Sequence, residues 1–305
     1  MEFSVVIPLY NKEKSIERAV RSVLAQTHQE FEIIIINDGS TDGSLANAQK
    51  IVDFRIKVFS QANMGVSVAR NVGISKAKYN LIAFLDADDE WHPKFLEKIC
   101  VLINTFPECG VFASAYWIVK KDGSKIRPFV PYSENFQTIL DDVIEHFRLY
   151  YPFNSSSVVV KKEKLIGVGG FPEGLIGSQD VVTWLKLSSV TKFAFVNSPL
   201  SVYRQDAENR AMDRVPPYDF YPPAKYLDNL LKEGELDSKY RKSAIEYIVK
   251  HQLTSAKRFI RKKEPLKAIK VIWTCKNTRQ QWLPLLRVLV YAIISIFIPS
   301  LSDQV

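Results

Sequence analysis

The N-terminal half of the chain alternates short apolar runs with segments of helical apolar spacing. Phe3–Leu9 (FSVVIPL) and Phe31–Ile36 (FEIIII) are continuous runs rich in β-branched residues, which predict strands buried on both faces. Between them, Ser15–Gln26 repeats its apolar residues on one helical face. The alternation continues with strands expected at Ile56–Phe59 and Leu81–Leu85 and helices at Val66–Ala77 and Lys94–Leu102. Strands separated by helices indicate βαβ units, so we expect an α/β fold with a mostly parallel sheet flanked by helices.

Polar clusters follow three of these strands. Tyr10 follows the first strand, the turn Asn37–Ser44 (NDGSTDGS) follows the second, and Asp86–Glu90 follows the fourth. Thr41 or Asp42 is placed to cap the helix after the turn. Because ligands of open α/β sheets bind at the carboxyl ends of the strands, these clusters mark the expected site.

From about residue 111 the pattern becomes mixed. The expected elements are strands at 111–119, 156–160, 193–196 and 201–203, a Gly-rich loop at 167–177 and a helix at 180–187. Such mixed order is compatible with a second half that completes the same sheet.

A Pro-rich segment at 216–223 (PPYDFYPP) indicates a domain boundary. We therefore expect one domain over residues 1–215, formed by halves 1–110 and 111–215, and an extension over residues 216–305. The helices expected in the extension are 224–232, 238–262 and 265–274.

The last apolar stretch lies within residues 283–301. Its uninterrupted part, Val288–Ile298, is confined by Arg287 on one side and Pro299 on the other. A transmembrane helix needs about 20 apolar residues, so this segment is short for a full span.

The charge of the chain is unevenly distributed. The chain has 41 Lys and Arg residues against 33 Asp and Glu residues, a formal net charge of +8. Residues 251–305 hold ten of the basic and two of the acidic residues, so the whole excess lies there and residues 1–250 are balanced. We therefore place any surface for an acidic partner in this tail.

The cysteines and the start of the chain favour a reducing cytoplasm. Cys100, Cys109 and Cys275 form no close pair, which excludes a disulfide framework and a CxxC zinc site. The start MEFSVVIPLYNKEK has no basic segment before its apolar run, so we expect no secretory signal.

Asp86, Asp88 and Asp89 stand within four residues directly after an apolar strand. Carboxylates this close repel one another unless a cation is present, and oxygen ligands of this kind suit Mg²⁺ or Mn²⁺. The alternative is a solvated acidic turn that caps the next helix. The segment by itself does not separate the two.

Asp38 and Arg70 lie in two further polar segments. Asp38 is placed to accept hydrogen bonds from a ribose or base, or alternatively to form an Asx turn that starts the next helix. Arg70 is placed to meet a phosphate or to pair with the acidic loops, and Gly65 and Gly73 near it permit close backbone approach.

Four motifs, VVIPLYN, IINDGSTDGS, NMGVSVARNVGI and FLDADD, occur in this order and resemble those of the family 2 glycosyltransferases of the GT-A fold. The resemblance is close from residue 3 to about residue 100 and continues to about residue 205 through SQDVVTWLKL and PLSVYR. It implies the GT-A nucleotide-diphospho-sugar transferase fold. It also implies transfer of a sugar from a nucleotide-sugar donor, with a UDP-sugar expected, to a hydroxyl of a glycan acceptor.

The resemblance further implies roles for the donor half. Pro8, Tyr10 and Asp38 match positions that hold the uracil and ribose of the donor. Asp86 and Asp88 match the DxD pair, which binds Mn²⁺ or Mg²⁺ between the protein and the diphosphate.

The resemblance assigns three roles beyond the acidic pair. Arg70 matches a position that supports the nucleotide pocket, and Arg204 matches a late basic position near the donor diphosphate. Asp180 matches the carboxylate that acts as general base, although Gln179 stands where the family has Glu. One base and a direct attack imply inversion at the anomeric carbon. Asp180 has an alternative as a helix N-cap.

Three other classes of protein are alternatives to a glycosyltransferase. A non-catalytic sugar-nucleotide-binding scaffold subunit is the main alternative, and the set Asp38, Asp86, Asp88 and Asp180 argues against it. A dinucleotide oxidoreductase would need GxGxxG after the first strand, and a sugar nucleotidylyltransferase would need a Gly-rich basic loop there. The segment PLYNKEKS is neither.

The basic tail, residues 251–305, has three interpretations. Its helices bind the anionic inner leaflet with Val288–Ile298 dipping into the bilayer, or 283–301 is a core helix, or the tail binds nucleic acid. No nucleic-acid-binding motif supports the third. We favour the first interpretation, binding to the membrane. It places the enzyme at the cytoplasmic face of the inner membrane, where it can reach a lipid-diphosphate-linked glycan. The expected role is therefore in cell-surface polysaccharide synthesis.

Overall fold

The computed structural model describes residues 1–210, 215, 218–273 and 282–297. The chain forms two compact units. The first comprises Met1–Val143 and Tyr150–Arg214, and the second comprises Ile144–Leu149 and Val215–Val305. The second unit therefore contains a short internal segment in addition to the C-terminal helices.

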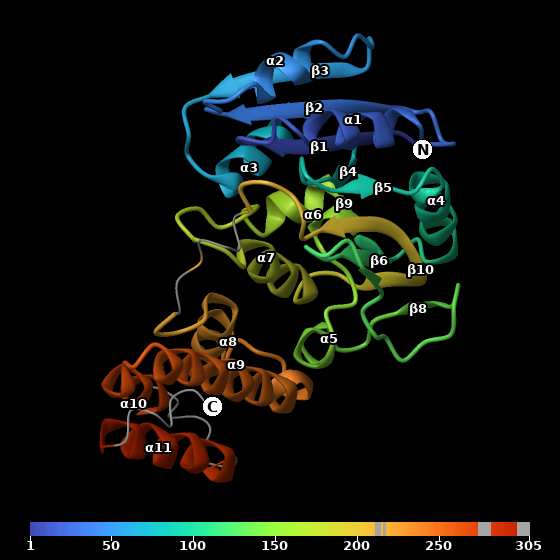
Figure 1. Ribbon diagram of the computed structural model, residues 1–305. Coiled ribbons are helices and arrows are strands. Elements are labelled where there is room, and N and C mark those ends of the chain that lie inside the picture. The colour runs from blue at the N-terminus through green and yellow to red at the C-terminus, as the bar shows by residue number, and fades with distance from the viewer. Residues whose placement is uncertain (211–214, 216–217, 274–281, 298–305) are drawn as a thin grey trace. The chain divides into compact units, whose positions relative to one another are not determined.

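The first unit is built on one mixed sheet (Figure 1). In the described part of the chain the strand order along its main path is β3-β2-β1-β4-β9-β6-β10-β5, with β7 beside β6 and β8 beside β10. The N-terminal strands, all parallel, are β1 (Phe3–Leu9), β2 (Phe31–Asp38), β3 (Ile56–Gln61) and β4 (Leu81–Phe84). The others are β5 (Glu90–Trp91), β6 (Val111–Val119), β7 (Lys125–Ile126), β8 (Gln137–Ile139), β9 (Val158–Lys161) and β10 (Phe193–Arg204). The expected α/β architecture is confirmed.

The run of apolar residues in β1 is explained by helices on both of its faces. Ile7 belongs to a core cluster with the apolar face of α1 (Ile16–Leu24). On the other face, Val6 lies against α3 (Val66–Lys76), where a Cβ atom on Gly73 would come within 2.3 Å of Val6 Cγ1. The close packing of α3 on β1 therefore depends on the missing side chain of Gly73.

Two details of the second βα connection differ from expectation. β2 continues past Ile36 to Asp38, so Asn37 and Asp38 are strand residues and do not belong to the turn. The next helix, α2 (Ser44–Gln49), has Gly43 as its N-cap, so neither Thr41 nor Asp42 caps it.

The second half of this unit adds elements that the sequence pattern did not predict. The segment expected as two strands is the single strand β10, which has register irregularities on both sides of Pro199, where the chain lacks a backbone donor. Helix α4 (Phe95–Thr105), expected at Lys94–Leu102, ends the first half, and the helices of the second half are α6 (Lys162–Gly167) and α7 (Gln179–Ser188). Trp184 of α7 is fully buried against Phe84 and Phe171 and so belongs to the core.

The second unit is helical. Its helices are α5 (Val143–Leu149, whose first residue belongs to the first unit), α8 (Pro222–Glu233), α9 (Arg241–Arg261), α10 (Pro265–Trp273) and α11 (Trp282–Phe297). A small core joins α9, α10 and α11 through residues such as Phe259, Val271 and Ala292. The expected segment 283–301 corresponds to α11, and its residues 298–301 lie outside the described part of the chain. None of the described helices combines the length and the apolar character that crossing a bilayer requires.

Candidate active site

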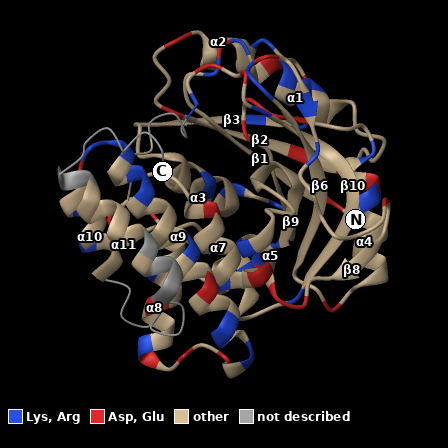
Figure 2. Ribbon diagram, turned by 60° about the horizontal axis from the view of Figure 1, so that its bottom comes forward, with Lys and Arg blue, Asp and Glu red and all other residues tan. Residues whose placement is uncertain are grey.

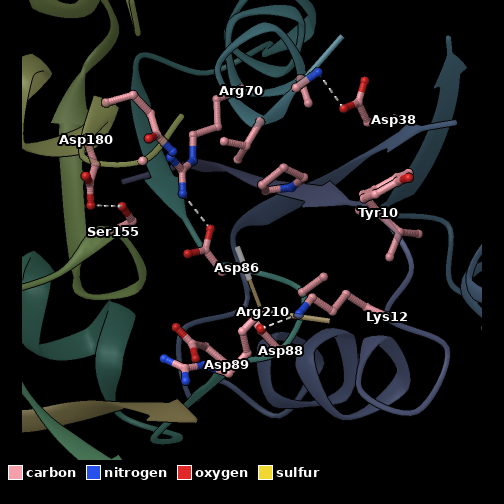
Figure 3. Close-up of a pocket in the computed structure, with 18 of the residues that line it drawn as sticks. Tyr10, Lys12, Asp38, Arg70, Asp86, Asp88, Asp89, Ser155, Asp180 and Arg210 are labelled. Atoms are coloured by element: carbon pink, nitrogen blue, oxygen red, sulfur yellow. Dashed lines mark hydrogen bonds and ion pairs between the residues drawn. The ribbon is translucent and has the colours of Figure 1, made fainter. Parts of the chain in front are cut away.

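A cavity of about 560 Å³ lies at the carboxyl ends of the parallel strands (Figure 3). It brings together seven of the eight site residues expected from the sequence: Pro8, Tyr10, Asp38, Arg70, Asp86, Asp88 and Asp180. The rule that places ligands at the strand ends of open α/β sheets therefore located the cavity correctly.

The walls of the cavity carry more acidic than basic side chains. Five carboxylates line it, those of Asp38, Asp86, Asp88, Asp89 and Asp180, against the three cations of Lys12, Arg70 and Arg210. An anionic ligand such as a diphosphate would add negative charge to an already acidic wall. A further cation beside these side chains would therefore favour its binding.

The acidic loop after β4 has a separate cation beside each of its first two carboxylates (Figure 3). Arg70 Nη2 donates to Asp86 Oδ1 over 2.6 Å, and Lys12 Nζ donates to Asp88 Oδ2 over 2.7 Å. The guanidinium of Arg70 is almost fully buried and stacks over the Phe171 ring at 5.0 Å. Within the described part of the chain, Arg70 has two donor nitrogens, Nε and Nη1, without a partner.

Burial raises the pKa values of two carboxyl groups in this loop, those of Asp88 and Asp89. It raises the pKa of the Asp88 carboxyl, against the opposing effect of the Lys12 ammonium, and nearby Asp86 raises it further. The pKa of Asp89 is raised well above its usual range by burial and by the charges of Asp88 and Asp86. Asp89 accepts hydrogen bonds from Ser156 Oγ at 2.6 Å and from the Arg204 backbone at 3.0 Å, so it fixes the loop in place.

Asp38 is buried at the end of β2 and shapes the neighbouring loop. Its Oδ1 accepts hydrogen bonds from Gln61 Nε2 at 2.8 Å and from the Met64 backbone at 2.9 Å, and its Oδ2 accepts from the Gly65 backbone at 2.9 Å. These bonds hold the loop of residues 63–65, of which Asn63 and Gly65 line the cavity beside Asp38. The carboxylate joins β2 to the start of α3, and it does not form the Asx turn considered from the sequence.

Asp180 lies in the first turn of α7, on the opposite side of the cavity in Figure 3 from Asp38 and Tyr10. Ser155 Oγ donates to its Oδ2 over 3.0 Å, and the Val181 backbone donates to its Oδ1 over 2.8 Å. The helix N-terminus favours a negative charge at this position. Ser178 is the N-cap of α7, so Asp180 is not the cap.

A short 3₁₀ turn, Ser155–Ser157, connects Asp180 to the acidic loop. Ser155 contacts Asp180, and the next residue, Ser156, accepts from the Asp86 backbone at 3.1 Å and donates to Asp89. The turn precedes β9, which runs antiparallel to β4, so its residues lie at the carboxyl end of β4. Two adjacent serines thus fix the separation between the two acidic parts of the cavity.

Arg204 is the expected site residue that does not line the cavity. Its guanidinium pairs with Glu90 at 2.8 Å and with Asp206 at 3.1 Å. A basic residue six positions later, Arg210, lines the cavity instead and donates to the Tyr203 hydroxyl over 2.8 Å.

Sequence analysis missed Lys12, Ser155, Ser156 and Arg210. The partner of Lys12 is 76 residues away and the partner of Ser155 is 25 residues away, so no local motif reveals either contact. One signal was present for the serines: the polar cluster NSSS precedes an apolar run, and it lies at the site because that strand is antiparallel.

The acidic pair fits a divalent cation. In the described residues one oxygen of each carboxylate, Asp86 Oδ1 and Asp88 Oδ2, is in an ion pair, and the other oxygen of each is in none. Mg²⁺ and Mn²⁺ are commonly held by one or two carboxylates together with phosphate oxygens and water. Within the described residues, no three His, Cys, Asp or Glu side chains are grouped to hold a metal.

Comparison with known proteins identifies relatives along much of the chain. The sequence model of the family described as Glycosyl transferase family 2 matches residues 4–152. TuaG of Bacillus subtilis (strain 168), whose description refers to teichuronic acid biosynthesis, is 32% identical over 205 residues, 66% of this chain and 78% of TuaG. The amylovoran biosynthesis glycosyltransferase AmsE of Erwinia amylovora is 30% identical over 197 residues, 62% of this chain and 70% of AmsE.

The fold has a match among solved structures. S. aureus TarS in complex with UDP-GlcNAc superposes with a TM-score of 0.65 at 20% sequence identity, covering 97% of this chain and 91% of that one. The expected GT-A fold is confirmed. The chain spans about a third of the length of other curated relatives, glycosyltransferases of Nostoc and Rickettsia conorii. From the extent of the matches to TuaG and AmsE, together with the family match over β1 to β8, we conclude that the chain belongs to glycosyl transferase family 2.

Proposed function

We propose that this chain is an inverting glycosyltransferase that uses a divalent cation to move a sugar from a UDP-sugar to a hydroxyl group of a glycan acceptor. The observation that carries the proposal is the presence in one cavity of the acidic pair Asp86 and Asp88 and, at a separate wall, of Asp180. The pair suits the diphosphate of the donor, and Asp180 suits the acceptor hydroxyl. The Ser155–Ser157 turn holds the two at a fixed separation.

The donor nucleotide is assigned to the wall formed by β1, β2 and α3. Pro8 and Tyr10 line this wall beside Asp38 and offer apolar and aromatic surface for a uracil. Asp38 Oδ2 accepts one described hydrogen bond and so has a lone pair left for a ribose hydroxyl. The two donors of Arg70 that have no described partner suit a phosphate oxygen.

Asp86 and Asp88 would hold Mg²⁺ or Mn²⁺ through their carboxylate oxygens. When bound, the cation supplies Lewis-acid stabilisation of the charge that develops on the departing diphosphate. Arg70 adds a fixed positive charge on the same side because it is buried and tied to Asp86. Because Arg70 is buried, its charge acts more strongly than a charge at the surface would.

Asp180 is assigned the role of general base. Both of its oxygens accept one hydrogen bond from the protein, which orients the carboxylate and leaves lone pairs to receive a proton. As the acceptor oxygen attacks the anomeric carbon, its proton passes to Asp180 and the bond to the diphosphate breaks. One such base and a single displacement give inversion of configuration.

We propose the class of polymer from the descriptions of two relatives. The descriptions of TuaG and AmsE refer to the biosynthesis of teichuronic acid and of amylovoran. We assign this chain by analogy to the synthesis of a bacterial cell-surface polysaccharide, on a lipid-diphosphate-linked acceptor at the cytoplasmic face of the inner membrane.

Helix α11 of the second unit supports a membrane-bound acceptor. Leu286, Val290, Ile293 and Ile294, which recur on one helical face, are each 37–43% exposed, whereas Ala292 on another face is buried in the small core of α9 to α11. Lys and Arg residues recur on the neighbouring helices α9 and α10 (Figure 2). An apolar stripe beside basic helices suits an anionic lipid surface, where each Lys or Arg contributes about 1 kcal/mol.

Co-sedimentation with liposomes tests the membrane assignment. The chain is expected to bind vesicles that contain anionic lipid and to bind neutral vesicles weakly, and Val290→Glu is expected to weaken both. The matched control is Val52→Glu in the first unit, since Val52 is 96% exposed and lies outside the stripe. Equal binding of wild type and Val290→Glu would remove the assignment.

A thermal-shift screen tests the donor and the cation. Sugars carrying UDP, GDP or dTDP are added to the full chain with and without Mn²⁺, because a ligand that binds only the native state raises its melting temperature. We expect the largest shift for a UDP-sugar with Mn²⁺ and a loss of the Mn²⁺ dependence in Asp88→Asn. Glu17→Gln, which removes an exposed acidic side chain of α1 outside the cavity, is the control. A shift that is the same for all three nucleotides refutes the donor assignment.

A further inference from the structure

The ammonium group of Lys12 lies against Asp88, where the proposed divalent cation would also bind. Its side chain is nearly buried, and its ammonium donates to Asp88 Oδ2 at 2.7 Å, to the Glu208 carbonyl at 2.5 Å and to the Asn209 carbonyl at 3.2 Å. An ammonium group has three hydrogens, so these three oxygens use all of them. One carboxylate oxygen and two carbonyls around a positive charge form the kind of oxygen shell that a divalent cation also prefers.

The two carbonyls belong to a strap, residues 205–210, that follows β10 and lies on the loop after β1. Asn209 Nδ2 donates to the carbonyls of Tyr10 and Asn11 at 3.4 and 3.3 Å. The Glu208 carboxylate accepts from Ser15 Oγ at 2.7 Å and from the Lys14 backbone at 3.0 Å. Asn209 and Arg210 of the strap line the cavity, so the strap forms part of its wall.

Lys12 is the residue that joins the strap to the acidic pair. The other described contacts of Glu208 and Asn209 are with Ser15 and with backbone groups of the loop after β1. Lys12 alone among the described contacts links Glu208 and Asn209 to Asp88. Two cations bound to the two oxygens of one carboxylate lie close together and therefore repel each other strongly. A divalent cation at Asp88 and the observed position of Lys12 therefore disfavour each other.

We propose that Lys12 and the divalent cation are alternative occupants of Asp88, so that entry of the cation releases Lys12 from Asp88 and loosens the strap over the donor cavity. This inference rests on the proposed function only in placing the cation at Asp88. It makes Lys12 a positioning residue, which acts on the donor site through Asp88 and the strap.

Mn²⁺ binding, measured on the full chain by electron paramagnetic resonance of the free ion in the absence of donor, tests the proposal. Removing the competing charge in Lys12→Gln is expected to tighten Mn²⁺ binding by about tenfold or more. Lys12→Arg keeps the charge and is expected to bind Mn²⁺ as weakly as the wild type. Lys14→Gln is the matched control, because the Lys14 side chain is exposed and makes no described contact with Asp88.

Hydrogen exchange of peptides that span residues 205–210 supplies the second readout. Mn²⁺ is expected to speed their exchange in the wild type, whereas in Lys12→Gln exchange is fast without Mn²⁺ and does not respond to it. Equal Mn²⁺ affinity of wild type and Lys12→Gln, or weaker binding by the variant, overturns the role of Lys12 and leaves the proposed transferase intact. Failure of both proteins to bind Mn²⁺ overturns the cation assignment of the proposed function, and the competition with it.

Discussion

The buried histidine of the second unit makes the stability of that unit depend on pH. His251 of α9 stacks between Tyr221 and Tyr247, with ring centroids at 4.4 and 4.3 Å. Its Nε2 is buried and has no hydrogen-bond partner among the described residues. Burial, together with the charges of Lys250 and Arg258, lowers the pKa of His251 from 6.5 to about 3.

The sign of the effect follows from these two pKa values. The unfolded chain binds a proton at His251 below about pH 6.5, whereas the native unit binds it only near pH 3. Unfolding therefore takes up a proton between these values, and each pH unit of acidification removes about 1.4 kcal/mol of native stability. Acidification from about pH 6.5 to about pH 5 is expected to remove roughly 2 kcal/mol.

Hydrogen exchange of α9 peptides in wild type and His251→Phe measures this contribution. Phe preserves the stacked ring and does not titrate, and carboxylates elsewhere titrate equally in both proteins. The wild type is expected to lose roughly 2 kcal/mol more opening free energy than the variant over this pH range. An identical loss in both proteins would show that His251 does not titrate on unfolding as its burial requires.

Two further predictions concern packing and catalysis. Gly73→Ala places a Cβ 2.3 Å from Val6 Cγ1 and is expected to lower the free energy of unfolding, measured in urea, by about 1–3 kcal/mol. The control Gly167→Ala, whose Cβ would have no atom within 4 Å, is expected to change it by less than about 0.5 kcal/mol. Equal free energies of unfolding for the two variants would contradict the packing argument. Ser155→Ala removes a hydrogen bond to the charged Asp180 and is expected to lower kcat about 10- to 100-fold with little change in the donor KM, whereas Ser155→Thr restores most of it. A raised KM with unchanged kcat in Ser155→Ala would instead place Ser155 in donor binding.

The parts of the fold that the sequence predicted are those set by local patterns. The runs FSVVIPL and FEIIII are buried because helices cover both faces of their strands, and the burial is visible in the sequence as continuous apolar character. Helix α5 and strand β8, which are short and lack a strong period, were not predicted. β10 was expected as two strands, 193–196 and 201–203, yet the residues on both sides of Pro199 pair with the same neighbour, β6.

The candidate site also has a part that local sequence patterns predict and a part that they do not. Asp38 ends the parallel strand β2, and Asp86 and Asp88 follow the parallel strand β4, so their convergence at one edge of the sheet follows from topology alone. Lys12 and Ser155 act through contacts between distant segments, which depend on the register of β9 against β4 and on the course of the chain after β10. A pattern along the sequence does not determine such contacts.

The most direct test of the central claim is a transfer assay on Asp180→Asn. Asn has nearly the shape of Asp and can still meet Ser155, but it cannot take up the acceptor proton. With the UDP-sugar and Mn²⁺ selected by the thermal-shift screen, we predict that the variant binds donor as the wild type does and transfers no measurable sugar to the acceptor. Turnover equal to that of the wild type would contradict the assignment of Asp180 as the base and, with it, the proposed mechanism.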